Sequence, residues 1–212
     1  MNYVELKNYK KTIRNNTVLN DVNLEIPQGQ IVGLYGRNAS GKTMLLRAIS
    51  GLIKPTAGTV RVNGILLSAT HPYPRSVGII IESLSFWPHY SAFMCLKILA
   101  EIKNIIDDEK IRDTMQRVDL DPHDKTPVRK FSMGMKQRLA IAQAIMEEPE
   151  LLLLDEPTNS LDTQSREIFR NVIHEENKKG STIIMASHIK EDLELCCQSF
   201  YSIEYGNITR ER

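Results

Sequence analysis

Eight residues near the start of the chain have the types and spacing of a phosphate-binding loop. The segment 36–43 matches the pattern G-x-x-x-x-G-K-[ST]. Its glycines allow successive backbone N–H groups to point into one concavity, where anionic oxygens bind. Lys42 can reach the β- and γ-phosphates of a nucleoside triphosphate, and the Thr43 hydroxyl can bind Mg²⁺. The predicted nucleotide contacts are Gly36, Arg37, Asn38, Ala39, Ser40, Gly41, Lys42 and Thr43.

The segments on either side of this loop have the patterns that such a loop requires. Ile31–Tyr35 is a short apolar run that predicts a buried strand, and Lys42–Leu52 has apolar residues at helical spacing. A helix that begins at the loop adds the positive end of its dipole to the anion site. The order strand, glycine-rich turn, helix makes a chance match to an ordinary turn a poor alternative.

Two adjacent carboxylates follow the most apolar run of the chain. Leu151–Leu154 predicts a central parallel strand that is covered on both faces, and Asp155 and Glu156 come next. The carboxyl end of such a strand opens into the ligand crevice of an α/β sheet. There Asp155 can hold Mg²⁺, and Glu156 can orient or deprotonate an attacking water. Two surface acids that end a strand are the alternative, and the phosphate loop makes it the weaker one.

Periodicity places these motifs in an α/β core with a helical insertion. Strands and helices alternate before residue 82 and after residue 146, which predicts a mostly parallel, layered α/β sheet. From 91 to about 145 the apolar residues recur at helical spacing instead. We therefore expect one domain, in which 1–82 and 146–212 form the core and 83–145 form a helical subdomain.

Composition excludes some classes of protein. The chain has 212 residues and a net charge of +1, so it lacks the basic excess of a nucleic-acid-binding protein. Its three cysteines, Cys95, Cys196 and Cys197, have no CxxC spacing and predict reduced thiols in the cytoplasm. No run of about eighteen apolar residues is present, so we expect membrane contact only through a partner.

A third motif narrows the prediction. Phe131-Ser132-Met133-Gly134-Met135-Lys136-Gln137-Arg138 lies at the start of a predicted helix, just before the acidic strand. By itself it is a capped helix start, which can also bind an anion. In this order along the chain it resembles the signature of ATP-binding cassette (ABC) ATPases, and the resemblance covers essentially all 212 residues.

The resemblance implies a fold and assigns further roles. It implies a P-loop NTPase core of the ABC ATPase type, with an N-terminal antiparallel β subdomain and an inserted helical subdomain. ATP would also contact Met44, and Ser132 and Gly134 of a second copy. Ser160-Leu161-Asp162 is similar to the loop that crosses the dimer interface, with Asp162 near the nucleotide. Glu156 would be the catalytic base and His188 the switch histidine, acting with Lys42.

Three departures from the family pattern concern four residues. Ile13 stands where an aromatic side chain usually stacks on adenine, and nearby Tyr9 could substitute for it. Met133 and Met135 replace the usual glycine and glutamine of the signature. Glu82 replaces the glutamine that touches Mg²⁺, and it can still ligate the ion but cannot donate from an amide. The glutamate and the signature together resemble the bacitracin and lantibiotic resistance branch of exporters.

The resemblance implies an ATPase subunit that powers transport, in the direction of export, through a separate integral-membrane permease. It also implies a second cassette, identical or different, and a place on the inner face of the cell membrane. The segment around Trp87 is rich in aromatic residues, which fits either a permease interface or packing under the helical subdomain. Alternatives are a soluble cassette ATPase acting on ribosomes or DNA, a P-loop kinase, and a module that has lost catalysis.

Overall fold

The computed structural model describes residues 2–81 and 85–211, and its centre is a six-stranded sheet. The strand order is β10-β9-β3-β8-β7-β6, and all neighbours pair in parallel except β10, which runs antiparallel at one edge. Parallel strands place their carboxyl ends at one edge, where ligands bind. The strands are β3 (Ile31–Tyr35), β6 (Val77–Ile80), β7 (Leu151–Asp155), β8 (Thr182–Ser187), β9 (Ser199–Glu204) and β10 (Asn207–Arg210).

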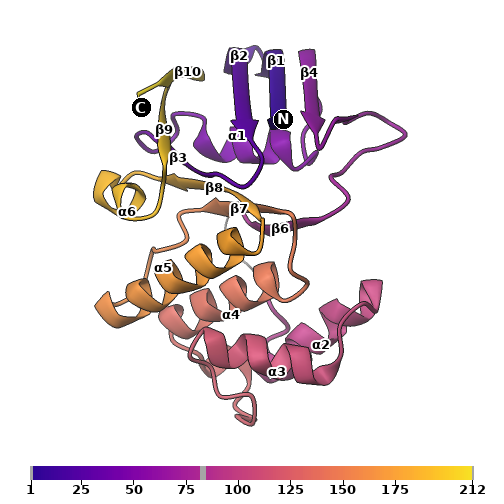
Figure 1. The fold of residues 1–212 in the computed structure, drawn as a ribbon, viewed down its shortest axis with the longest axis vertical. Helices are drawn as coiled ribbons and strands as arrows, with labels where there is room; N and C mark the ends of the chain where they lie inside the picture. Colours follow the sequence, from indigo (N-terminus) through magenta and orange to yellow (C-terminus); the bar gives the residue numbers. More distant parts are fainter. Residues whose placement is uncertain (1, 82–84, 212) are drawn as a thin grey trace.

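A second, antiparallel sheet lies beside the central one, with helix α1 (Lys42–Ile49) between them (Figure 1). Its order is β2-β1-β4-β5, and every pair in it is antiparallel. This sheet is the N-terminal β subdomain that the family resemblance implied. Its strands are β1 (Asn2–Ile13), β2 (Asn16–Pro27), β4 (Ala57–Val62) and β5 (Ile65–Leu66).

Strand β7 divides its leucines between two hydrophobic cores. Leu151 and Leu153 pack with α1 and the antiparallel sheet, whereas Leu152 and Leu154 pack with the helices on the opposite face. The division follows from the two-residue period of a strand, which points alternate side chains to opposite faces. All four leucines are at most 1% exposed, as expected for a central parallel strand.

The helices cover the other face of the central sheet (Figure 1). Helix α4 packs against β6 and α5, and α2 and α3 pack together farther from the sheet. A Cβ on Gly78 of β6 would lie 1.9 Å from the Ala144 carbonyl oxygen, so only glycine allows α4 to come this close. The helices are α2 (Ala92–Lys103), α3 (Asp108–Arg117), α4 (Met133–Ile145), α5 (Thr163–Lys178) and α6 (Lys190–Glu194), with a 3₁₀ turn at Val128–Lys130.

The structure corrects two expectations about elements. The helix after the phosphate loop ends at Ile49, three residues earlier than predicted. Strands β9 and β10 were not predicted, yet β9 pairs directly with β3, the strand that leads into the loop. The named helices and strands among the described residues of 85–145 are all helical, which agrees with a helical insertion.

Candidate nucleotide site

The phosphate loop connects β3 to α1 by a backbone that requires glycine. Gly41, the residue before α1, has φ 117°, a conformation that residues with a Cβ rarely adopt. No side chain caps the start of α1. The N–H groups of its first turn therefore point into the cavity without a side-chain acceptor, as an anion site requires.

Lys42 lies across the loop and faces the acidic strand. The residue is 5% exposed, and its ammonium donates to the carbonyl oxygens of Gly36, at 2.7 Å, and Arg37, at 3.1 Å. Its Nζ also lies 3.6 Å from Glu156 Oε1. The positive charge is thus fixed between the loop and the carboxylate.

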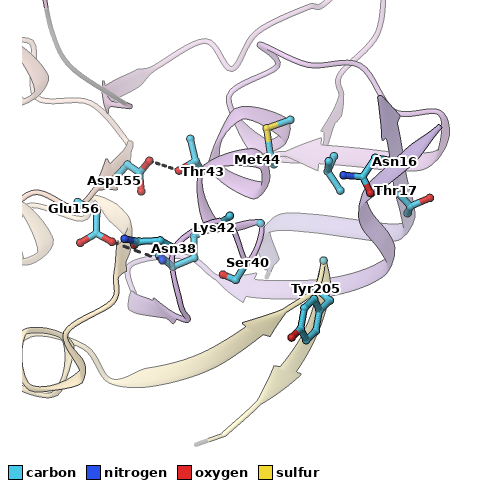
Figure 2. Close-up of a pocket in the computed structure, with 14 residues that line it drawn as sticks. Asn16, Thr17, Asn38, Ser40, Lys42, Thr43, Met44, Asp155, Glu156 and Tyr205 are labelled. Atoms are coloured by element: carbon cyan, nitrogen blue, oxygen red, sulfur yellow. Dashed lines mark hydrogen bonds and ion pairs between the residues drawn. The ribbon is translucent and has the colours of Figure 1, made fainter. Parts of the chain in front are cut away.

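Thr43 and Asp155 form the candidate Mg²⁺ site. The Thr43 hydroxyl donates to Asp155 Oδ2 at 2.5 Å (Figure 2), and the carboxylate is nearly buried at the end of β7. Within the described part of the chain, no group of three His, Cys, Asp or Glu side chains is placed to hold a metal by itself. A hydroxyl and one carboxylate suit Mg²⁺, which typically takes its other ligands from water and substrate phosphates.

Glu156 contacts His188 from a strained backbone position. Its φ is 47°, in the left-handed region that costs a non-glycine residue about 1–2 kcal/mol. Its N–H donates to the Ala186 carbonyl at 2.9 Å, which fixes it against β8. Glu156 Oε2 then lies 2.9 Å from His188 Nδ1 and 3.5 Å from the Ser187 hydroxyl. Strain of this kind concentrates at functional sites.

Lys42, Thr43, Asp155 and Glu156 line one cavity of about 640 Å³ (Figure 2), whereas His188 does not line it. Besides the loop, Asp155 and Glu156, it is lined by residues that were not predicted. The start of β2 contributes at one end, and the β9–β10 turn contributes Tyr205 and Gly206. Gly206 N–H donates to the Ser40 carbonyl at 2.9 Å and holds that turn against the loop. The unpredicted lining residues are Asn16, Thr17, Val18, Tyr205 and Gly206.

The comparisons with known proteins agree with this geometry. A family model described as "ABC transporter" matches residues 19–159. The chain belongs to this family. A similar chain is the "Uncharacterized ABC transporter ATP-binding protein YybJ" of Bacillus subtilis (strain 168), 46% identical over 97% of this chain and 94% of that one.

Two further relatives bear names that indicate transport. "Lantibiotic transport ATP-binding protein SrtF" of Streptococcus pyogenes is 34% identical over 99% of this chain and 90% of its own length. "Bacitracin transport ATP-binding protein BcrA" of Enterococcus faecalis is 36% identical, over 100% and 70%. These names match the branch that Glu82 and the signature indicated.

Solved structures share the fold. The "Structure of ATP binding subunit of ABC transporter" superposes with a TM-score of 0.89 at 27% identity, and covers 99% of this chain and 89% of that one. A dimeric cassette in a post-hydrolysis state with ADP and Pi also gives 0.89, at 23% identity over 99% and 98%. Membership of this family makes the protein an ABC ATP-binding subunit and an ATPase.

The signature of this ABC subunit lies apart from its phosphate loop. Ser132 caps α4 and accepts from the Met135 N–H at 3.1 Å, and neither Ser132 nor Gly134 lines the cavity. Asp162 caps α5 by accepting from Ser165 N–H at 2.8 Å, which holds the pKa of its carboxyl below the usual value. It does not line the cavity either.

The adenine contact is the least defined part of the site. Ile13 pairs with Asn16 in the β1–β2 hairpin and is 41% exposed, but it is not among the residues that line the cavity. Tyr9 is fully buried, and burial raises the pKa of its phenol to about 12, so the suggestion that it could stack on adenine was wrong. Met44 does line the cavity.

Glu82 and the aromatic segment around Trp87 are the remaining predicted features. Glu82 lies outside the described residues. Trp87 is 42% exposed, whereas Phe86 packs against the helical core, so the aromatic segment divides between surface and packing. No helix in the described ranges is both long and apolar enough to cross a bilayer.

Proposed function

We propose that this protein powers transport, in the direction of export, through a separate integral-membrane permease, by ATP-driven closure of a dimer of cassettes. The observation that carries the proposal is the separation of two anion-binding sites in one chain. The phosphate loop lines the cavity, whereas Ser132 and Gly134 lie at the start of α4, outside it. A second cassette would supply its own Ser132 and Gly134 to complete the nucleotide site.

The branch rests on the relatives, and the direction of export rests on the resemblance to the bacitracin and lantibiotic resistance exporters. Transport ATP-binding proteins for lantibiotic and bacitracin match nearly all of this chain. The second cassette can be the same chain or a different one. The proposed place of the subunit is the cytoplasmic face of the cell membrane, held there by the permease. We also propose that the chain is a single ABC ATPase domain, in which 1–82 and 146–212 form the α/β core with its β subdomain and 83–145 form the helical subdomain.

The proposed chemistry is in-line attack of water on the γ-phosphate. Glu156 would orient the water and accept its proton, since its carboxylate lies between Lys42 and His188. Lys42, His188 and the N–H groups of the loop would stabilise the charge on the transferring phosphoryl group. Thr43, Asp155 and Glu82 would hold Mg²⁺, which supplies charge neutralisation between the β- and γ-phosphates.

The first test is Glu156→Gln. The amide cannot accept the proton of water, so we expect hydrolysis to fall roughly 100-fold or more while ATP affinity is kept. With ATP, the variant should elute as a stable dimer in size-exclusion chromatography. Glu167→Gln, at an exposed acid on α5, is the control and should behave as wild type. Wild-type turnover by Glu156→Gln would remove Glu156 from the role of base.

Co-purification tests whether the subunit binds a membrane permease. A membrane protein that co-purifies with the wild-type subunit from detergent-solubilised cells supports the proposal. ATP-stimulated retention of ribosomes or DNA instead would favour the alternative, a soluble cassette ATPase.

A further inference from the structure

A buried carboxylate, Asp192, contacts Thr158 in the segment that follows Glu156. Asp192 belongs to α6, the short helix that follows His188, and is 8% exposed, whereas Glu191 and Glu194 of the same helix are exposed. A buried charge is costly unless hydrogen bonds and opposite charges surround it. The partners of Asp192 therefore show what its burial achieves.

One oxygen of this carboxylate contacts the segment between β7 and α5, and the other contacts Arg166 of α5. Thr158 Oγ1 donates to Asp192 Oδ2 at 2.6 Å, and Arg166 Nη1 lies 3.4 Å from Oδ1. Arg166 Nε in turn donates to the carbonyl oxygen of Leu161 at 3.3 Å. The side chain of Asp192 thus holds the beginning of the segment 158–161 directly and its end through Arg166.

These contacts form a second connection between the two segments that carry the proposed catalytic pair. Thr158 follows Glu156 by two residues, and Asp192 follows His188 by four. Glu156 and His188 themselves meet at 2.9 Å. Two contacts therefore join the segments 156–158 and 188–192: the Glu156–His188 contact at one end and the Thr158–Asp192 hydrogen bond at the other.

The contacts of the residues that follow Glu156 also help to hold its backbone conformation. Its φ of 47° is unfavourable for a side chain with a Cβ, and such a conformation persists only where its surroundings hold it. Asn159 N–H donates to the Glu156 carbonyl at 3.2 Å, and Thr158, between the two, is 4% exposed. Loss of the Thr158–Asp192 hydrogen bond would therefore allow residues 157 and 158, which follow Glu156, to move.

We propose that Asp192 is a positioning residue for ATP hydrolysis, which through Thr158 and Arg166 holds Glu156 against His188 and fixes the segment 158–161. The inference rests on the proposed roles of Glu156 and His188. It assigns no contact between Asp192 and ATP, because Asp192 does not line the cavity. Its removal should therefore affect turnover rather than binding.

The experiment compares Asp192→Ala, Asp192→Asn and Thr158→Val with wild type. For each, steady-state hydrolysis gives kcat and KM, a fluorescent ATP analogue gives Kd, and thermal unfolding gives Tm. We expect kcat of Asp192→Ala to fall about 10- to 100-fold, because small misplacements of catalytic groups cost this much. The analogue Kd should change less than about threefold. Asp192→Asn should lie between Asp192→Ala and wild type, since its amide oxygen can still accept from Thr158.

Thr158→Val keeps the shape of the side chain and removes only the hydroxyl. If Asp192→Ala does not fold, the kcat of Thr158→Val tests whether the Thr158–Asp192 bond supports turnover. The double variant Thr158→Val/Asp192→Asn should be no slower than the slower single variant, as expected for two residues of one contact. Glu194→Ala, at an exposed acid of α6, is the matched control. The proposal is overturned if Thr158→Val and Asp192→Asn keep kcat within twofold of wild type, or if kcat and affinity fall together.

The assay needs only the isolated protein and ATP, so its outcome does not depend on a permease. Failure of the proposed function would be seen in the capture experiment, and failure of the role of Glu156 in Glu156→Gln. The results of the capture experiment and of the Glu156→Gln assay are thus obtained independently of the kcat of Asp192→Asn.

Discussion

At the scale of single residues, the chemistry was largely predictable because it depends on residue types at short spacings. Lys42, Thr43, Asp155 and Glu156 meet in one cavity because a strand end and a loop place them there. The lining that was missed comes from the start of β2, at Asn16, and from the β9–β10 turn, at Tyr205. A turn has no spacing rule that ties it to a distant loop, so sequence alone does not reveal such a contact.

The adenine end of the site permits a gain-of-affinity prediction. Ile13 lies at the end of β1 and is partly exposed, beside the cavity residue Asn16. We predict that Ile13→Tyr binds ATP about tenfold more tightly, because stacking of a base on an aromatic ring contributes about 1–3 kcal/mol. Titration with a fluorescent ATP analogue measures the change.

Ile13→Val is the control for this prediction and should leave affinity unchanged. An Ile13→Tyr variant with wild-type affinity for ATP would show that adenine does not lie beside this strand end.

At the scale of elements, prediction succeeded where periodicity and capping agreed. Helix α5 was expected at Thr163–Lys178 and has those bounds, because Asp162 caps its start and Gly180 follows its end. Strands β9 and β10 were missed because their sequences, SFYSIE and NITR, are short and lack a regular alternation of apolar and polar residues. Pairing of β9 with β3 outweighs that weak local signal.

An ionic cluster joins α3 of the helical insertion to the core. Glu176 of α5 is fully buried, and Arg117 Nη2 and Lys179 Nζ lie 2.6 Å and 3.0 Å from its Oε1. Nearby, hydrogen bonds from Lys110 and Lys179 hold the pKa of Glu148 at about 2. Arg117 and Lys110 both belong to α3, so the cluster connects the two parts of the molecule.

Removal of Arg117 should therefore be costly. We predict that Arg117→Ala lowers the free energy of unfolding by about 3 kcal/mol, because it leaves the Glu176 charge buried with one cation fewer. Urea unfolding followed by circular dichroism measures the loss. In the double variant Arg117→Met/Glu176→Met the loss should be smaller, since no charge is then left buried. Equal losses in both variants would contradict this explanation.

At the scale of the whole molecule, the two anion sites make a prediction about dimers. We predict that Lys42→Ala and Gly134→Asp chains are each inactive alone and regain ATPase activity when mixed. A mixed dimer keeps one site with an intact phosphate loop from one chain and an intact signature from the other. Random pairing across a symmetric interface should give about a quarter of the wild-type rate.

The matched control is the Lys42→Ala/Gly134→Asp double variant mixed with Lys42→Ala, which offers no intact site. If the two motifs served one nucleotide within a single chain, the first mixture would also stay inactive.

The leucine strand β7 has a consequence for how the molecule melts. Leu151 and Leu153 belong to the core around α1, and Leu152 and Leu154 to the core under the helices. The same strand thus contributes to both hydrophobic cores, and loss of either core would expose one of its faces to water. We expect the antiparallel layer and the helical layer to unfold in one cooperative step, although their packing is separate.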